Sequence, residues 1–431
     1  MTHHVGQDAT TLWQSIREAV NSAGATTLER GAGCIAVALG EMVVSARTAK
    51  HRDVAAALSA GHGPCTVTAA SERACVTGAA TANAYLMHAR LTDDSYRVAA
   101  HPGLAVVPVG LAAAEWATRA LDRSVDGITL LRSVIGGYEC ACRLADQLLP
   151  VVSQRGWRVT SVIAPLAAAA TAALLLEMTD EVGIAALGLA SAASGGPLGV
   201  VAVDGDGWRL QPALAVQAGV SAALAAQAGL RAGDEALTEH HGLYAQFGYS
   251  GKSQIRNPAQ GIHRVTFKRY PVAMYGQSIF EALRTSPPLN GQVDEITVAV
   301  SPFAVEYGGQ RRASPNSISS IPGILTAAID ALHPGLEFAH EPDRRHVEVV
   351  GDAALPELAA RVGIRLKNGT QFDFAGDGDT SGWDLADFDR HCQDLLGEQG
   401  VAISEAAADL SGRGEVDALL DLWRSSSSVI H

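Results

Sequence analysis

Aromatic residues are scarce in this chain, at 5% of its 431 residues, although hydrophobic residues as a whole make up 48%. The core must therefore consist mainly of Ala, Val and Leu, and such small side chains let helices approach closely. This composition favours a compact and mostly helical body. Basic residues are also few, since 32 Lys and Arg stand against 45 Asp and Glu for a net charge of −13. Nucleic-acid affinity needs clustered Lys and Arg, so the charge argues against such a partner.

Several further signals are missing. There is no polybasic segment that would suggest an anionic membrane surface, and the start, "MTHHVGQDATTLW", lacks the basic and apolar regions of a signal peptide. The most apolar stretch, residues 162–176, is interrupted by Pro165 and Thr171 and is shorter than the roughly 20 residues of a membrane span. None of the six cysteines forms a C-x-x-C pair, so we expect buried free thiols. These features predict a soluble, cytoplasmic protein.

From about residue 10 to residue 260 the sequence is typical of consecutive helices. Apolar residues recur at helical spacing, and short breaks with Gly, Pro or Asp separate the segments. Pro108 and Pro212 are expected in the first turn of their helices. The predicted helices span residues 11–21, 80–90, 109–120, 126–148, 162–178, 182–194 and 213–230.

The pattern changes near residue 262. Residues 295–307 and 345–352 alternate as strands do, and 363–374 reads as a hairpin with Asn368-Gly369 at its turn. The segments "SISSIPGILTAAIDALH" and "DLADFDRHCQDLLGEQG" add helices. The predicted fold is therefore mainly α, with a large all-helical domain and a smaller α+β lid domain. The helical domain covers residues 1–261 and is completed by C-terminal helices at 396–431, and the lid domain covers 262–395.

One polar stretch follows an apolar helix, in "MHARLTDDSYRVAAHPGLAVVPVGLAAAE" at residues 87–115. A loop there can place Asp93, Asp94, Ser95 and His101 around one cavity near the helix ends. On spacing alone an alternative stays open, in which an aspartate caps a helix and His101 lies in a surface turn.

The same stretch resembles the signature of the MmgE/PrpD family, which includes 2-methylcitrate dehydratase, cis-aconitate decarboxylase and iminodisuccinate epimerase. The family pattern is roughly N-x-x-x-x-H-x-x-D-F-D-D-T, a spacer, and H-P-G. Three further segments match family elements in the right order: "GYECACRLA" at 137–145, "GWRVTSVIAPLAAAATAALLL" at 156–176 and "FKRYPVAMYGQSIFEAL" at 267–283. The resemblance implies the same two-domain fold and commonly a homodimer.

Carried over by position, the resemblance implies a site that is only partly kept. The family's first aspartate is Leu91 here, its threonine is Ser95, the histidine of its G-F-H segment is Arg158 and the last histidine of its lid motif is Gln277. We assign His101, Lys268 and Ser95 to catalysis. Substrate binding is assigned to His88, Asp93, Asp94, Arg158, Arg269, Tyr270 and Gln277.

The altered residues favour anionic ligands, because an arginine grips carboxylate or phosphate with two N–H groups. The resulting hypothesis is a lyase that works without cofactor or metal and eliminates water or phosphate from a small carboxylate. Natural-product metabolism is its expected setting. His101 or Lys268 would be the base. The alternative is an isomerase, epimerase or decarboxylase that uses the same carbanion chemistry. An isomerase or epimerase would differ from the lyase because the mass of its product equals that of its substrate. A third hypothesis is a related protein that binds ligand without catalytic activity.

Overall fold

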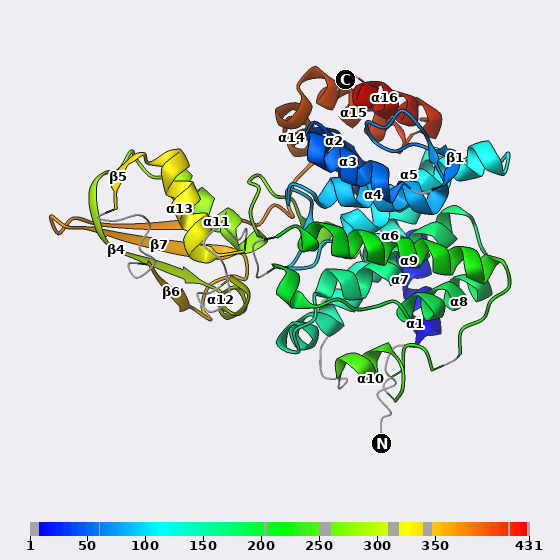
Figure 1. Cartoon of the computed structure of the whole chain (residues 1–431), viewed down its shortest axis with the longest axis horizontal. Coiled ribbons are helices and arrows are strands. Elements are labelled where there is room, and N and C mark those ends of the chain that lie inside the picture. The colour runs from blue at the N-terminus through cyan, green and yellow to red at the C-terminus, as the bar shows by residue number, and fades with distance from the viewer. Residues whose placement is uncertain are drawn as a thin grey trace.

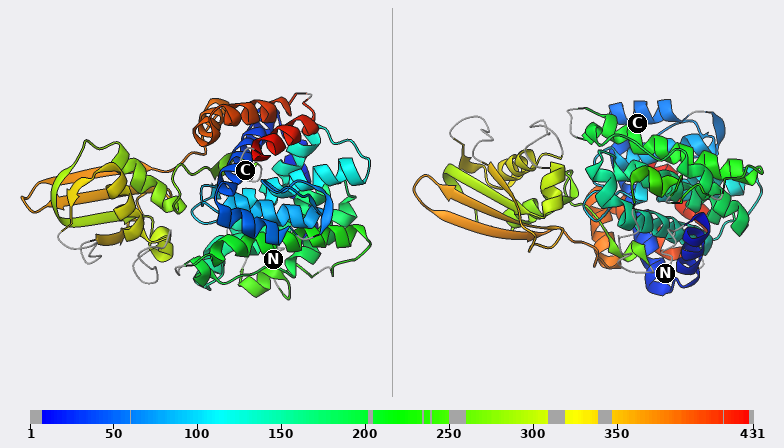
Figure 2. Two further views of the ribbon diagram at one scale, coloured as in Figure 1. Left: turned by 45° about the horizontal axis from the view of Figure 1, so that its top comes forward. Right: turned by 90° about the horizontal axis from the view of Figure 1, so that it is seen from below.

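The computed structural model describes most of the chain, and Figures 1 and 2 show its division into a helical domain and a smaller lid domain. The two domains lie side by side and are joined by narrow connections in all three views. The described residues are 8–59, 61–201, 205–233, 235–238, 240–249, 260–308, 319–338, 347–412 and 414–428.

The helical domain is built from the first part of the chain and from its C-terminal end. Its helices are α1 (Ala9–Asn21), α2 (Ala25–Ala46), α3 (Ala49–Leu58), α4 (Val76–His88), α5 (Gly103–Ala120), α6 (Gly127–Gln154), α7 (Val159–Leu175), α8 (Asp180–Ser191), α9 (Gly207–Gln227), α10 (Leu243–Phe247), α14 (Leu385–Leu396), α15 (Glu398–Asp409) and α16 (Val416–Ser428). The short elements are β1 (His62–Cys65), β2 (Ser95–Tyr96), β3 (Val265–Thr266) and the 3-10 turns η1 (Leu198–Val201) and η2 (Gly261–Arg264).

Alanine-rich helices form the centre of this domain, as the composition predicts. Helix α7 is buried on almost every side and packs against α5, α6, α8 and α9. Side-chain caps stabilise the starts of several helices. At the start of α6, for example, the side chain of Asp126 accepts a hydrogen bond from the amide of Thr129. Of the cysteines, five are buried and Cys75 is half-buried.

Two helices begin earlier than the positions of their prolines suggest. Pro108 lies inside α5, which starts at Gly103, and Pro212 lies inside α9, which starts at Gly207. The prediction that each proline occupies a first turn is therefore wrong. Both rings are buried in the helical core, so their packing offsets the backbone hydrogen bond that proline cannot donate.

Helix α2, which the apolar pattern did not reveal, lies in the middle of the domain. It contains Gly31, Gly33 and Gly40, and glycine lowers helix propensity and blurs the pattern. Gly33 is required by packing, because a Cβ there would lie 2.4 Å from the ring of Phe388 in α14. The close approach of α2 and α14 thus explains a glycine that propensity alone argues against.

The lid domain is a twisted sheet with helices on one face (Figure 2). Strand β4 pairs in parallel with β5 and β6 along one edge and antiparallel with β7 on the other, and β8 continues the sheet beyond β7. Helix α11 packs on β7 and β8, and α13 packs on α11. The bounds are α11 (Met274–Arg284), β4 (Asn290–Val300), α12 (Pro302–Gly308), α13 (Ile321–Leu332), β5 (Gly335–Glu337), β6 (Val347–Gly351), β7 (Ala359–Leu366) and β8 (Gln371–Asp377).

The predicted hairpin at 363–374 corresponds to β7 and β8, with Gly369 at a positive φ of 87° in the turn. The strand predicted over 295–307 is wrong in its second half. It ends at Val300, and helix α12 begins at Pro302, where proline suits a first helical turn.

The C-terminal helices return to the helical domain, but earlier than predicted. Helix α14 packs on α2, so residues 385–395 belong with the helical domain rather than with the lid. In α16, Arg424 contacts Glu115 of α5, with Arg424 Nη2 3.3 Å from Glu115 Oε1. The prediction of a mainly α protein with a smaller α+β domain is confirmed.

Arg30 of α2 holds both connections between the domains. Its guanidinium donates to the carbonyls of Ile262 and Val265 on the way into the lid and to that of Trp383 on the way back. The same group lies 5.2 Å from the ring centre of Phe267. One buried cation therefore fixes the two chain crossings relative to the helical core.

Within the described ranges, no individual helix has the length and hydropathy for a membrane crossing, and only the sharply bent pair α2 and α3 meets both criteria jointly.

Candidate active site

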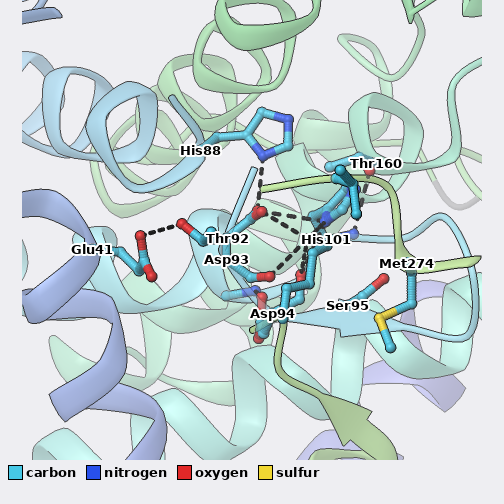
Figure 3. A network of polar contacts seen from close by, with 12 residues as sticks. Glu41, His88, Thr92, Asp93, Asp94, Ser95, His101, Thr160 and Met274 are labelled. Atoms are coloured by element: carbon cyan, nitrogen blue, oxygen red, sulfur yellow. Dashed lines mark hydrogen bonds and ion pairs between the residues drawn. The ribbon is translucent and has the colours of Figure 1, made fainter. Parts of the chain in front are cut away.

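The polar stretch that follows α4 forms a buried loop at the junction of the two domains. It runs from α4 through β2 to the start of α5, and β2 pairs with β3, so that Ser95 lies opposite Thr266. This pairing brings Lys268, two residues after β3, onto the loop. Figure 3 shows the side chains of the loop gathered between α2, α4 and the segment that leads into the lid.

Lys268 and Asp93 form an ion pair that is wholly shielded from solvent. Lys268 Nζ lies 2.9 Å from Asp93 Oδ1 and donates to the Asp93 carbonyl at 2.7 Å. Both side chains have no exposed surface. Burial opposes ionisation of Asp93, but the charge of Lys268 and the neighbouring histidines hold its pKa below the usual value.

His88 connects this ion pair to Arg158. His88 Nδ1 lies 2.8 Å from Asp93 Oδ2, and His88 Nε2 lies 2.7 Å from Arg158 Nη2. Burial lowers the pKa of His88 to about 4, so the ring is neutral near pH 7. In that form Nδ1 donates to the carboxylate and Nε2 accepts from the guanidinium. Both ring nitrogens of His88 are therefore used in hydrogen bonds, so neither is free to accept a proton from a substrate.

His101 differs from His88 in the use of its nitrogens. Its Nδ1 lies 2.9 Å from the carbonyl oxygen of Asp94 and 3.2 Å from Lys268 Nζ. Donation from Nδ1 to the carbonyl fixes the tautomer whose Nε2 carries a lone pair. Burial and the charge of Lys268 place the pKa of His101 well below the usual 6.5. His101 is thus neutral near pH 7, and its Nε2 has no hydrogen-bond partner among the described residues.

Both carboxyl oxygens of Asp94 accept hydrogen bonds from neighbouring parts of the protein. Its Oδ1 accepts from the amide of Gly103, at the start of α5, and its Oδ2 accepts from the hydroxyl of Tyr138 at 2.6 Å. Burial and the charge of Asp93 raise the pKa of Asp94 to about 7. A Cβ on Gly103 would lie 2.6 Å from the Asp94 carboxyl. The glycine of the H-P-G sequence is therefore needed for this carboxyl to reach the helix start.

The remaining predicted residues lie apart from the row of linked side chains formed by Lys268, Asp93, His88 and Arg158. The hydroxyl of Ser95 donates to the carbonyls of Arg97 and Ala100, which closes the loop on itself. Among the described residues, the side chain of Gln277 bonds only backbone groups of its own segment, from Arg269 to Val272.

Arg269 and Tyr270 both contact Glu281 of α11, and 45% of the Arg269 side chain is exposed. The structure therefore brings His88, Asp93, Asp94, His101, Arg158 and Lys268 together, and it does not bring Ser95, Arg269, Tyr270 and Gln277 to the same atoms. The catalytic role assigned to Ser95 and the binding roles assigned to Arg269, Tyr270 and Gln277 remain predictions.

Three residues at the site were not selected from the sequence. Trp208 packs edge-on against His88, with ring centres 5.2 Å apart, and its carbonyl accepts from Arg158. Thr160 bonds the backbone of the loop beside His101. Tyr138 holds Asp94. Tyr138 and Thr160 lie inside the segments that resemble the family elements, so a signal existed for them, whereas Trp208 had none.

His88, Asp93 and His101 also resemble a metal-binding set. Their ligand atoms lie within 4.8 Å of one another. However, the ammonium of Lys268 contacts both Asp93 and His101, and Arg158 contacts the far side of His88. A divalent cation at these atoms would stand beside two fixed positive charges. The donor set therefore fits the lysine better than it fits a metal ion.

Comparison with known proteins identifies one family. The MmgE/PrpD N-terminal domain matches residues 9–256, which is more than half of the chain. A search of the curated proteins finds no match.

Proposed function

The chain belongs to the MmgE/PrpD family, and on that basis we propose that it is a lyase for a small carboxylate-bearing anion. The family includes dehydratases, which supports a dehydratase-like activity in general terms. The proposed reaction is a β-elimination that needs no cofactor, in which water or phosphate leaves the substrate. The observation that carries this proposal is a neutral imidazole, His101, in a cluster that also contains two cations, Lys268 and Arg158.

His101 is the proposed base. Its Nδ1–H is committed to a backbone carbonyl, so Nε2 takes the proton from the carbon next to the substrate carboxylate. Burial weakens this base in the free protein, but a bound anion nearby would raise its proton affinity. The choice between His101 and Lys268 thus favours His101, because the protons of Lys268 are directed at Asp93.

Arg158 and Lys268 supply the positive charge that such a reaction needs. Proton loss places negative charge on the substrate carboxylate, and nearby cations stabilise that charge in a site with little water. A guanidinium has five N–H donors, and within the described residues two of them are used, toward Trp208 and His88. Arg158 therefore keeps donors for a carboxylate or phosphate.

The elimination is then balanced in electrons and protons. The C–H electron pair forms the new carbon–carbon double bond, and the carbon–oxygen bond to the leaving group breaks. For water, the imidazolium of His101 returns its proton to the departing hydroxide. For phosphate, the leaving group departs as an anion, and Arg158 can bind it without transferring a proton. The imidazolium of His101 then releases its proton to water.

Proton exchange in D₂O tests the proposal with a panel of candidate substrates. Small hydroxy and phosphorylated carboxylates are incubated with the protein, and NMR follows deuterium entry beside the carboxylate and the appearance of alkene protons. We expect an alkene product with the natural protein and a loss of about 10²-fold or more with His101→Gln. Deuterium entry without loss of mass would favour an epimerase, and equal rates with His101→Gln would overturn the assigned base.

A further inference from the structure

A second group of buried polar atoms lies beside the loop, next to Thr92. It consists of Glu41 in α2, Arg90 after α4 and His391 in α14. Within the described part of the chain, Glu41 Oε1, Arg90 Nη1 and His391 Nε2 are each buried without a hydrogen-bond partner. Buried polar atoms are nearly always paired, so three orphans from three separate segments require an explanation.

The distances among these atoms suit a bridging ligand. Arg90 Nη1 lies 3.6 Å from Glu41 Oε2, and His391 Nε2 lies 4.0 Å from Glu41 Oε1. Both separations are too long for direct hydrogen bonds. A single small ligand between the three side chains could contact all of them at ordinary hydrogen-bond distances.

The chemistry of the three side chains indicates an anion. Arg90 is a permanent cation and offers an N–H group, and burial lowers the pKa of His391 to about 4, so its ring is neutral and has one N–H. Burial raises the pKa of Glu41 to about 7, so its carboxyl gains a proton near neutral pH. Each of the three side chains can then donate a hydrogen bond to an anion. The other charged groups that act on these side chains are Asp93, Lys268, Arg269 and Asp394.

We propose that Glu41, Arg90 and His391 bind one small monovalent anion, of the size of chloride or formate, together with a proton on Glu41. The site is distinct from the row formed by Lys268, Asp93, His88 and Arg158. It is connected to that row through the chain, because Thr92 donates to Glu41 Oε2 and directly precedes Asp93. Occupation of the site does not depend on the function proposed above.

The binding site also bears on the conformation of the loop. Glu41 contacts Arg90 and Thr92, the two residues that flank Leu91. Leu91 has a φ of +59°, a left-handed conformation that is unfavourable for a residue with a Cβ. An anion between Glu41 and Arg90 would hold both neighbours of this strained residue and so favour the conformation that presents Asp93 to Lys268.

Bromide provides a direct test, because its anomalous X-ray signal separates it from water. Crystals of the full chain are soaked in bromide at about pH 6 and about pH 8.5. We expect an anomalous peak between the three side chains at the lower pH and a much weaker peak at the higher pH. Addition of formate should displace the bromide if the site accepts either kind of anion. A water molecule at both pH values, with no anomalous peak, would overturn the proposal.

Two variants separate the contributions of charge and proton. Glu41→Gln is permanently neutral and still offers an N–H, so it should bind bromide equally at both pH values. Arg90→Met should lose the peak, while Arg390→Met, on the exposed side of α14, should keep it. If Arg90→Met fails to fold, the pH-independence of Glu41→Gln still decides. Equal pH dependence in Glu41→Gln and the natural protein would contradict the proton-coupled site.

Discussion

Lys268 and Asp93 lie 175 positions apart in the sequence, yet Lys268 Nζ is 2.9 Å from Asp93 Oδ1 and neither side chain has exposed surface. A buried ion pair of this kind is costly to form and still more costly to break, because removal of one partner leaves an unpaired charge in the interior. Asp93 lies in the loop of the helical domain and Lys268 in the segment that enters the lid, so the pair also joins these two parts of the chain.

Lys268→Met should therefore destabilise the protein strongly. We expect a loss of about 3–5 kcal/mol in the free energy of unfolding, the range for breaking one partner of a buried pair. Denaturant unfolding at pH 7 measures the change. Combination with Asp93→Asn should recover part of the loss, since the second change removes the unpaired carboxylate. Additive losses in the double variant would show that the two side chains are not coupled.

The sequence identified most of the residues in this cluster but not their arrangement. The loop residues were found because polar groups are crowded after an apolar helix, and Arg158 and Lys268 were found only through the family resemblance. No pattern could show that His88 lies between Asp93 and Arg158, with both ring nitrogens used. That arrangement depends on how α4 and α7 each pack against α5 and α9, which is a tertiary property.

Helix α2, which contains three glycines, is not predicted from the apolar pattern of the sequence. The pattern of apolar residues gave α4 to α9 in outline, because those helices have clear breaks between them. The pattern does not predict helix α2, because that helix is buried on nearly all sides and so has little polar periodicity. Its glycines are explained only by the helices that pack on it, and α14, which faces Gly33, lies far along the chain in the C-terminal part.

Gly33→Ala should weaken the contact between α2 and α14. The added methyl group would lie 2.4 Å from the ring of Phe388, so the ring or the helix must move. Overpacking of this kind costs about 1–3 kcal/mol, which thermal unfolding would detect.

Gly40→Ala is the matched control for this change, two turns further along the same helix. Its nearest neighbour is the flexible end of Leu395 at 3.2 Å. Helix propensity favours alanine by about 1 kcal/mol, so Gly40→Ala should be neutral or stabilising. An equal loss of stability in both variants would mean that packing on Phe388 is not the reason for Gly33.

Glu41→Gln should flatten the pH dependence of stability. Burial raises the pKa of Glu41 from 4.5 to about 7, so folding takes up a proton between these values. The contribution of this group is fully present below about pH 4.5 and is lost as the pH rises through 7. A shift of this size corresponds to roughly 3 kcal/mol.

The measurement is the free energy of unfolding at about pH 5 and about pH 8, with the natural protein and the variant in the same buffers. The difference between the two proteins should move in favour of the variant as the pH rises. Asp94 and the buried histidines also titrate in this range, but they are common to both proteins and cancel in the comparison. A constant difference across the range would show that Glu41 does not take up a proton on folding.

Arg30→Lys should loosen both connections to the lid while leaving the helical domain folded. A lysine cannot donate to three separated carbonyls as the fork of the guanidinium does, and it lacks the planar face that lies over Phe267. Hydrogen exchange followed by mass spectrometry should show faster exchange in residues 262–268 and 378–384. Exchange in α7, at the centre of the helical domain, should change little. Uniformly faster exchange throughout the chain would instead mean that Arg30 supports the helical core as a whole and does not act at the connections.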